Sequence, residues 1–144
     1  MDSDPLTIEQ VERGPMRGIF ASYNLFKGRE CNASNYIRAK YTLGKELIEP
    51  FLEVVRFNAE RCDSLKGFFL NHSLAGATGS GFTALLAERL SVEFPKKIKI
   101  NETVFGDNWA STQPVVEPYN SLLGLSDLVE HSDMIVMSQN AKLN

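Results

Sequence analysis

The chain has 144 residues, of which 43% are hydrophobic, which is enough for one domain with a single core. Its 18 acidic and 15 basic residues give a net charge of −3, which excludes a general attraction to nucleic acid or to an anionic membrane. No signal-peptide pattern and no run of roughly 18 apolar residues is present, so the sequence predicts a cytoplasmic protein that does not enter a membrane.

The first half of the sequence predicts two helices. Residues 5–13 have apolar side chains at helical spacing, and a short edge strand is expected around Leu25 and Phe26. Helical periodicity then extends over roughly residues 34–61. Pro50 predicts a kink or a break near residues 46–49, because proline lacks a backbone donor and crowds the preceding turn.

The second half alternates strands and helices. The expected strands are residues 65–73, 98–105 and 134–137, and the expected helices are residues 82–93 and 115–130. The first of these strands is apolar enough for the interior of a parallel sheet. In the last helix, a stripe at helical spacing is expected to be buried: Val116, Tyr119, Leu122, Leu123 and Val129. Since parallel strands need crossover helices, the order predicts an α/β fold, a partial Rossmann-like parallel sheet with helices on both faces.

Small residues separate the first of these strands from the helix that follows. Residues 73–81 read Ser-Leu-Ala-Gly-Ala-Thr-Gly-Ser-Gly. Backbone N–H groups in such a segment can approach an anion closely, and the N-terminus of the next helix adds donors and the positive end of its dipole. The pattern predicts a phosphate site, although a plain turn between strand and helix has the same composition.

Two known phosphate motifs can be compared with this segment. A Walker loop needs a lysine, and none lies between Lys66 and Lys96. The dinucleotide fingerprint G-x-G-x-x-A fits Gly79 to Ala84, with Glu102 as the acidic residue about 20 positions further on. An NAD(P)-type dinucleotide-binding enzyme is therefore an alternative prediction.

Residues 75–81 also resemble the tubulin signature Gly-Gly-Gly-Thr-Gly-Ser-Gly, with two glycines replaced by alanine. The similarity continues through residues 82–92 and 115–121, and residues 35–46 resemble an upstream part of the same family. Residues 130–133, Glu-His-Ser-Asp, resemble the alpha type most. Nearly the whole chain resembles part of a tubulin's nucleotide-binding domain.

The resemblance implies a single partial domain, residues 1–144, that lacks the family's first strand and loop and everything after the strand ending near residue 138. It implies a GTP-binding protein of the cytoplasmic cytoskeleton, a constituent of microtubules with GTP and Mg²⁺ as cofactors and other tubulin subunits as partners. Hydrolysis in the family needs a neighbouring subunit, so the isolated chain is expected to be inactive as a GTPase. A third alternative is a non-catalytic interaction fragment, or an incomplete gene product with no biochemical role.

The same resemblance assigns nucleotide-binding residues and no catalytic residue. It places the phosphates at Ser73, Gly76, Ala77, Thr78 and Gly79, the ribose at Thr112, Gln113 and Glu117, and the guanine edge at Asn140. Asp4 is assigned to nucleotide and magnesium, while its position before residues 5–13 equally predicts a helix cap. Ala77 replaces a glycine and is expected to carry a conformational cost if that position needs a positive φ.

Overall fold

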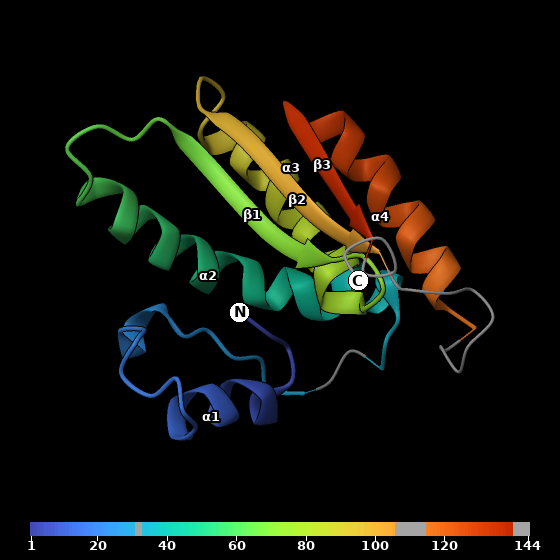
Figure 1. The fold of residues 1–144 in the computed structure, drawn as a ribbon. Helices are drawn as coiled ribbons and strands as arrows, with labels where there is room; N and C mark the ends of the chain where they lie inside the picture. The colour runs from blue at the N-terminus through green and yellow to red at the C-terminus, as the bar shows by residue number, and fades with distance from the viewer. Residues whose placement is uncertain (31–32, 106–114, 140–144) are drawn as a thin grey trace.

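The computed structural model describes residues 1–30, 33–105 and 115–139. Its elements are, in chain order, α1 Pro5–Arg13, the 3₁₀ helix η1 Ser22–Asn24, the π-helix η2 Arg38–Thr42, α2 Leu43–Glu60, β1 Gly67–Ser73, the π-helix η3 Thr78–Phe82, α3 Thr83–Glu93, β2 Ile98–Phe105, α4 Glu117–His131 and β3 Met134–Gln139. Figure 1 shows strands β1 to β3 side by side with helices behind them, which confirms the α/β prediction. None of the described helices is long and apolar enough to cross a bilayer.

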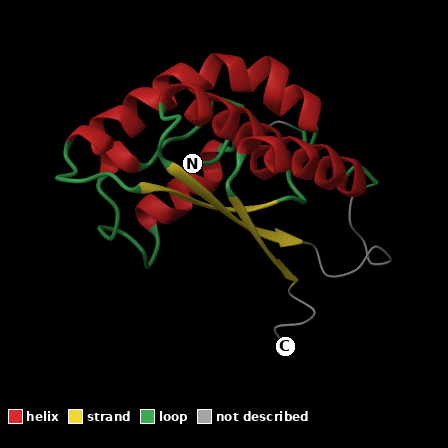
Figure 2. Cartoon of the chain, turned by 90° about the horizontal axis from the view of Figure 1, so that it is seen from above, coloured by secondary structure: helices red, strands yellow, loops and turns green. Residues whose placement is uncertain are grey.

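The sheet is parallel, with the order β1-β2-β3. Figure 2 shows α2, α3 and α4 on the same face, so the expectation of helices on both faces is wrong for the described part of the chain. Each new strand is added on the same side of the previous one. Because the helical crossovers between parallel strands are right-handed, all of them then lie on one face of the sheet. Helices cover both faces only where the direction of strand addition reverses. β1, expected inside the sheet, lies at its edge in this three-stranded arrangement.

Helix α3 lies at the centre of the core. One cluster joins it to α2 through the buried residues Ile48, Leu52, Phe82, Leu85, Leu86 and Leu90, with Phe68 and Leu70 of β1 packed against them. A second cluster joins it to α4 through Leu74, Ala87 and Leu128, with Phe105 and Ile135 from the sheet. These two clusters fix the start of α3 against the end of β1, where the small residues lie.

The central strand β2 points polar side chains toward the helices. Lys99, Asn101 and Thr103 are buried, whereas Ile98 is exposed. The buried groups have polar partners: Asn101 Nδ2 donates to Ser132 Oγ at 2.5 Å, and Thr103 Oγ1 donates to a backbone carbonyl of β3 at 3.3 Å. The opposite face of the sheet carries four exposed apolar side chains, namely Phe69, Ile98, Met134 and Val136.

Helix α4 buries the face that its hydrophobic pattern did not predict. Its buried residues are Asn120, Ser121, Gly124 and Leu128. The expected apolar stripe is wrong, because Tyr119, Leu122, Val129 and the others are exposed, Leu122 at 69%. The buried polar groups are satisfied by distant backbone carbonyls, and Gly124 admits close contact, since a Cβ there would lie 2.9 Å from Ser80 Cβ.

Two further expectations in the first half are wrong, namely a helix break near residues 46–49 and a strand around Leu25 and Phe26. α2 continues through Pro50, and the irregular turn lies earlier, in η2. Pro50 and Glu46 are both exposed, so water can satisfy the carbonyl of Glu46 that has lost its intrahelical donor. No strand forms around Leu25 and Phe26 in the described structure; instead Lys27 makes a single parallel bridge to Asp2.

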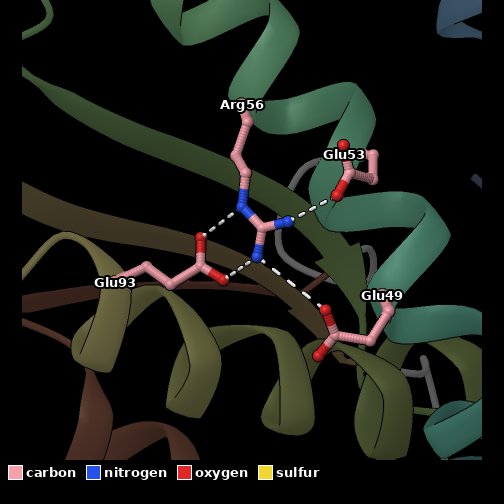
Figure 3. A network of polar contacts seen from close by, with 4 residues as sticks. All are labelled: Glu49, Glu53, Arg56 and Glu93. Carbon is pink, nitrogen blue, oxygen red and sulfur yellow. Dashed lines mark hydrogen bonds and ion pairs between the residues drawn. The ribbon is translucent and has the colours of Figure 1, made fainter.

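Arg56 connects α2 to the end of α3, as Figure 3 shows. Its Nε donates to Glu93 Oε2 at 3.0 Å, and a second guanidinium nitrogen bonds the other oxygen of that carboxylate. Glu53 accepts a further bond at 2.8 Å, and Glu49 lies 3.8 Å away. The hydrogen bond to Glu93 is the main cause that raises the pKa of Arg56. None of these four residues lines the pocket described next.

Candidate functional site

A pocket of about 520 Å³ lies beside the end of β1. The first four residues of the chain, the second half of β1, and the start of α3 with the residues before it line the pocket, together with Ser34 and Phe51. It brings together six of the predicted site residues: Asp4, Ser73, Gly76, Ala77, Thr78 and Gly79. Its volume lies within the roughly 300–1,000 Å³ range of small-molecule sites.

The small-residue segment is helical over more of its length than the sequence predicted. Helical structure begins at Ala77 and continues through η3 into α3, with Ser80 N donating to Gly76 O at 3.0 Å. Ala77 has φ −65° and ψ −39°, which any L-residue adopts, so the expected conformational cost of replacing a glycine here is wrong. The first turn of a long helix therefore begins at the pocket, and N–H groups in a first turn have no partner within their own helix.

Two glycines of this segment have different surroundings. A Cβ at Gly79 would lie 1.9 Å from the carbonyl oxygen of Ser73, so only glycine allows the helix start to rest against the end of β1. A Cβ at Gly76 would meet nothing within 4 Å. Gly79 thus sets the position of the helix start, and Gly76 borders open space.

Hydroxyl and carboxylate groups from the N-terminus meet this helix start. Ser3 Oγ lies 2.8 Å from Thr78 Oγ1, and Thr78 Oγ1 donates to Asp2 Oδ1 at 3.4 Å. The same Asp2 oxygen accepts from Asp4 N at 3.2 Å. Asp4 caps α1 by accepting from Leu6 N at 3.0 Å, which confirms the capping role, and it also lines the pocket.

His72 lines the pocket from β1. Burial lowers its pKa and keeps the ring neutral at pH 7, although the backbone of Gly79 and Ser73 and the side chain of Asn101 lie close enough to oppose that shift in part. Neither ring nitrogen makes a hydrogen bond of good geometry with a described residue. Asn101 Oδ1 also makes no such hydrogen bond among the described residues. A pair of buried polar groups therefore lies under the helix start.

The N-terminal segment, which was predicted through Asp4, contributes two further polar side chains to the pocket. Asp2 and Ser3 reach Thr78 because backbone bonds hold Asp2 beside a later loop, with Asp2 N donating to Phe26 O at 3.2 Å and Gly28 N donating to Asp2 O at 2.8 Å. Asp2 lies two residues before the predicted Asp4, so its acidic side chain was a usable signal. Nothing in the sequence marks Ser3.

Comparison with known proteins gives the family. Residues 1–144 match the family model described as "Tubulin/FtsZ family, GTPase domain". The chain belongs to the tubulin/FtsZ family. It is 44% identical over 140 residues to the tubulin alpha-4 chain of Drosophila melanogaster and 43% identical to the tubulin alpha-2 chain of Caenorhabditis elegans, and both alignments cover 97% of this chain. The chain spans 30% and 31% of the lengths of these relatives.

The tubulin resemblance predicted four further residues, of which the structure describes one. Glu117 is the first residue of α4 and does not line the pocket; its Oε2 is buried without a hydrogen-bond partner among the described residues. Thr112, Gln113 and Asn140, predicted for ribose and guanine, lie outside the described residues. The structure thus brings together the five residues that the resemblance assigns to the phosphates.

The dinucleotide alternative is not favoured. Its acidic residue, Glu102, lies within β2 between Asn71 and Val136 and does not line the pocket. Its glycine pair, Gly79 and Gly81, lies inside the π-helix η3. The tubulin/FtsZ match, in contrast, covers the whole chain.

Proposed function

We propose that residues 1–144 form part of a tubulin-like nucleotide-binding domain and that the pocket beside β1 binds the phosphates of GTP. One observation supports this above all others. The first turn of the helix that leads into α3, the hydroxyls of Ser3 and Thr78, and the carboxylates of Asp2 and Asp4 meet in a single pocket of about 520 Å³. The match to a GTPase-domain family favours GTP as the nucleotide.

The helix start supplies what a polyphosphate needs. Its N–H groups and the positive end of its dipole favour negative charge. The open space beside Gly76 leaves room for a phosphate close to the backbone. Thr78 also lines the pocket, and its Oγ1 adds a hydroxyl group. Gly79 keeps this helix start against β1, so the donors hold one position.

The residues present also fit Mg²⁺. Magnesium is commonly bound by one or two carboxylates together with phosphate oxygens and water, and Asp2 and Asp4 both line the pocket. Within the described ranges no group of three metal-binding side chains occurs, which agrees with an ion that arrives with the nucleotide. When bound, the ion would neutralise phosphate charge.

The partners and the setting follow from the relatives. Those compared above are named as alpha-tubulin chains, which supports other tubulin subunits as partners, a cytoskeletal place in the cytoplasm and a role in microtubules. The unpaired edge of β1 and the apolar outer faces of the sheet and α4 are consistent with a domain that is covered by further protein. We propose that the isolated chain binds GTP without appreciable turnover, because hydrolysis in this family needs a neighbouring subunit.

Replacing Thr78 with alanine tests the phosphate site. The substitution removes one hydroxyl at the pocket and should weaken GTP binding about fivefold, since a hydrogen bond of this kind contributes about 1 kcal/mol. Titration with a fluorescent guanine nucleotide measures the effect. Thr7→Ala, at an exposed position of α1, is the matched control and should bind as the parent chain does. Equal affinity in Thr78→Ala and Thr7→Ala would remove Thr78 from the site.

A further inference from the structure

Three side chains form a polar cluster between η2 and α4, outside the pocket: Lys40 and Tyr36 are buried, and the side chain of Asp127 is 25% exposed. Lys40 is only 7% exposed, and its Nζ lies 2.5 Å from Asp127 Oδ2. The hydroxyl of Tyr36, which is 5% exposed, donates to the same carboxylate oxygen. Burial alone would raise the pKa of Asp127, but the bonds from Lys40 and Tyr36 outweigh it and lower that pKa, so the carboxylate is charged at neutral pH.

Helix α4 also bonds the backbone of two other segments through Asn120. Asn120 Oδ1 accepts from Tyr36 N at 3.1 Å, and its Nδ2 donates to Ser34 O at 2.8 Å and to Ala75 O at 3.3 Å. A single amide therefore links the start of the η2 region with the segment between β1 and η3. The Asp127 cluster lies two turns further along the same helix.

η2 and α4 both lie in close contact with η3. A Cβ at Gly81 would lie 2.5 Å from Tyr36 O and 2.9 Å from Ala39 Cβ. A Cβ at Gly124 would lie 2.9 Å from Ser80 Cβ. Because these contacts leave no free space, a shift of η2 relative to α4 moves the η3 backbone as well.

The ion pair in this cluster is better suited to fixing the position of η2 on α4 than to raising the stability of the fold. Apolar side chains of similar volume often stabilise a buried site as well as an ion pair does, whereas an ion pair that loses one partner leaves a buried charge unpaired. Lys40 and Asp127 therefore favour one placement of η2 on α4 and penalise others.

We propose that Asp127 is a positioning residue for the phosphate site: through Lys40 and Tyr36 it fixes η2 on α4 and so holds η3 where the helix start meets the phosphates. The inference rests on the proposed function for its effect on GTP binding. Its structural part, the placement of η3, can be measured without any nucleotide.

The test compares two ion pairs in the full chain. Asp127→Asn removes the charge that holds η2, and Glu93→Gln weakens the Arg56 ion pair, which links α2 to α3 away from the pocket. Amide hydrogen exchange of residues 77–82, measured without nucleotide, should become about tenfold faster in Asp127→Asn and stay unchanged in Glu93→Gln. Tyr36→Phe, which keeps the ion pair, should give a smaller change in the same direction and serves if Asp127→Asn does not fold.

GTP titration of the same variants completes the test. Affinity should fall in Asp127→Asn and remain at the parent value in Glu93→Gln. Unchanged exchange of residues 77–82 in Asp127→Asn, or an equal increase in Glu93→Gln, would overturn the positioning role. If the parent chain binds no GTP, the proposed function fails, and the exchange result still decides whether Asp127 places η3.

Discussion

Gly79→Ala is expected to abolish GTP binding and to lower the melting temperature by roughly 3–10 °C, because overpacking of this kind costs about 1–3 kcal/mol. The added Cβ would lie 1.9 Å from Ser73 O, which is a backbone atom at the end of β1, so the main chain has to shift. The helix start must then leave the strand, and its N–H groups leave the pocket with it. Differential scanning calorimetry and nucleotide titration measure the two effects.

Gly76→Ala is the matched control for the fold. A Cβ at Gly76 would meet nothing within 4 Å, so this variant should melt within about a degree of the parent chain. If Gly79→Ala folds and binds GTP as the parent does, η3 does not rest on β1 in the way described.

Leu128→Ala is expected to lower the free energy of unfolding by about 2–5 kcal/mol, because it creates a cavity in a filled core. Leu128 has no exposed surface and packs with Leu74 and Ala87. Leu122→Ala, six residues earlier in α4, removes the same atoms from a side chain that is 69% exposed, and should change stability by less than about 0.5 kcal/mol. Denaturant unfolding of both variants measures the difference. Equal losses would mean that α4 buries the apolar stripe that its periodicity indicates.

The order of elements could be predicted because prolines mark clear boundaries between helices and strands in the sequence. α1 and β2 have the predicted bounds, residues 5–13 and 98–105, since Pro5 opens the helix and Pro95 separates β2 from the helix before it. The alternation of strands and helices predicted the parallel sheet correctly. The side of the sheet that the helices occupy depends on strand order, which no local pattern contains.

The buried faces of α4 and β2 could not be predicted from hydrophobicity. Asn120 is buried because its amide bonds Ser34 O and Ala75 O, and Asn101 is buried beside Ser132. Such partners are distant in the sequence, and a periodicity analysis treats each polar side chain as solvent-facing. Where long-range hydrogen bonds satisfy a polar stripe, the pattern points to the wrong face.

The small-residue segment was predicted to line a site, but its backbone conformation was not predicted. The signature located Ser73 and residues 76–79, and all five line the pocket. A glycine-rich signature does not specify φ, so the sequence could not show that Ala77 already has a helical backbone. The Lys40 and Asp127 pair had no signal at all, because the two residues meet only through the packing of η2 on α4.

Nucleotide-dependent melting of the purified full chain tests the central claim most directly. A ligand that binds only the folded state stabilises it by about 2.7 kcal/mol at one hundred times its Kd, which corresponds to a rise of roughly 5–10 °C for a domain of this size. GTP with Mg²⁺ should give this rise, and ATP or NAD at the same concentration should give a smaller one. A larger shift with NAD than with GTP, or no shift with GTP at millimolar concentration, would contradict a GTP site beside β1.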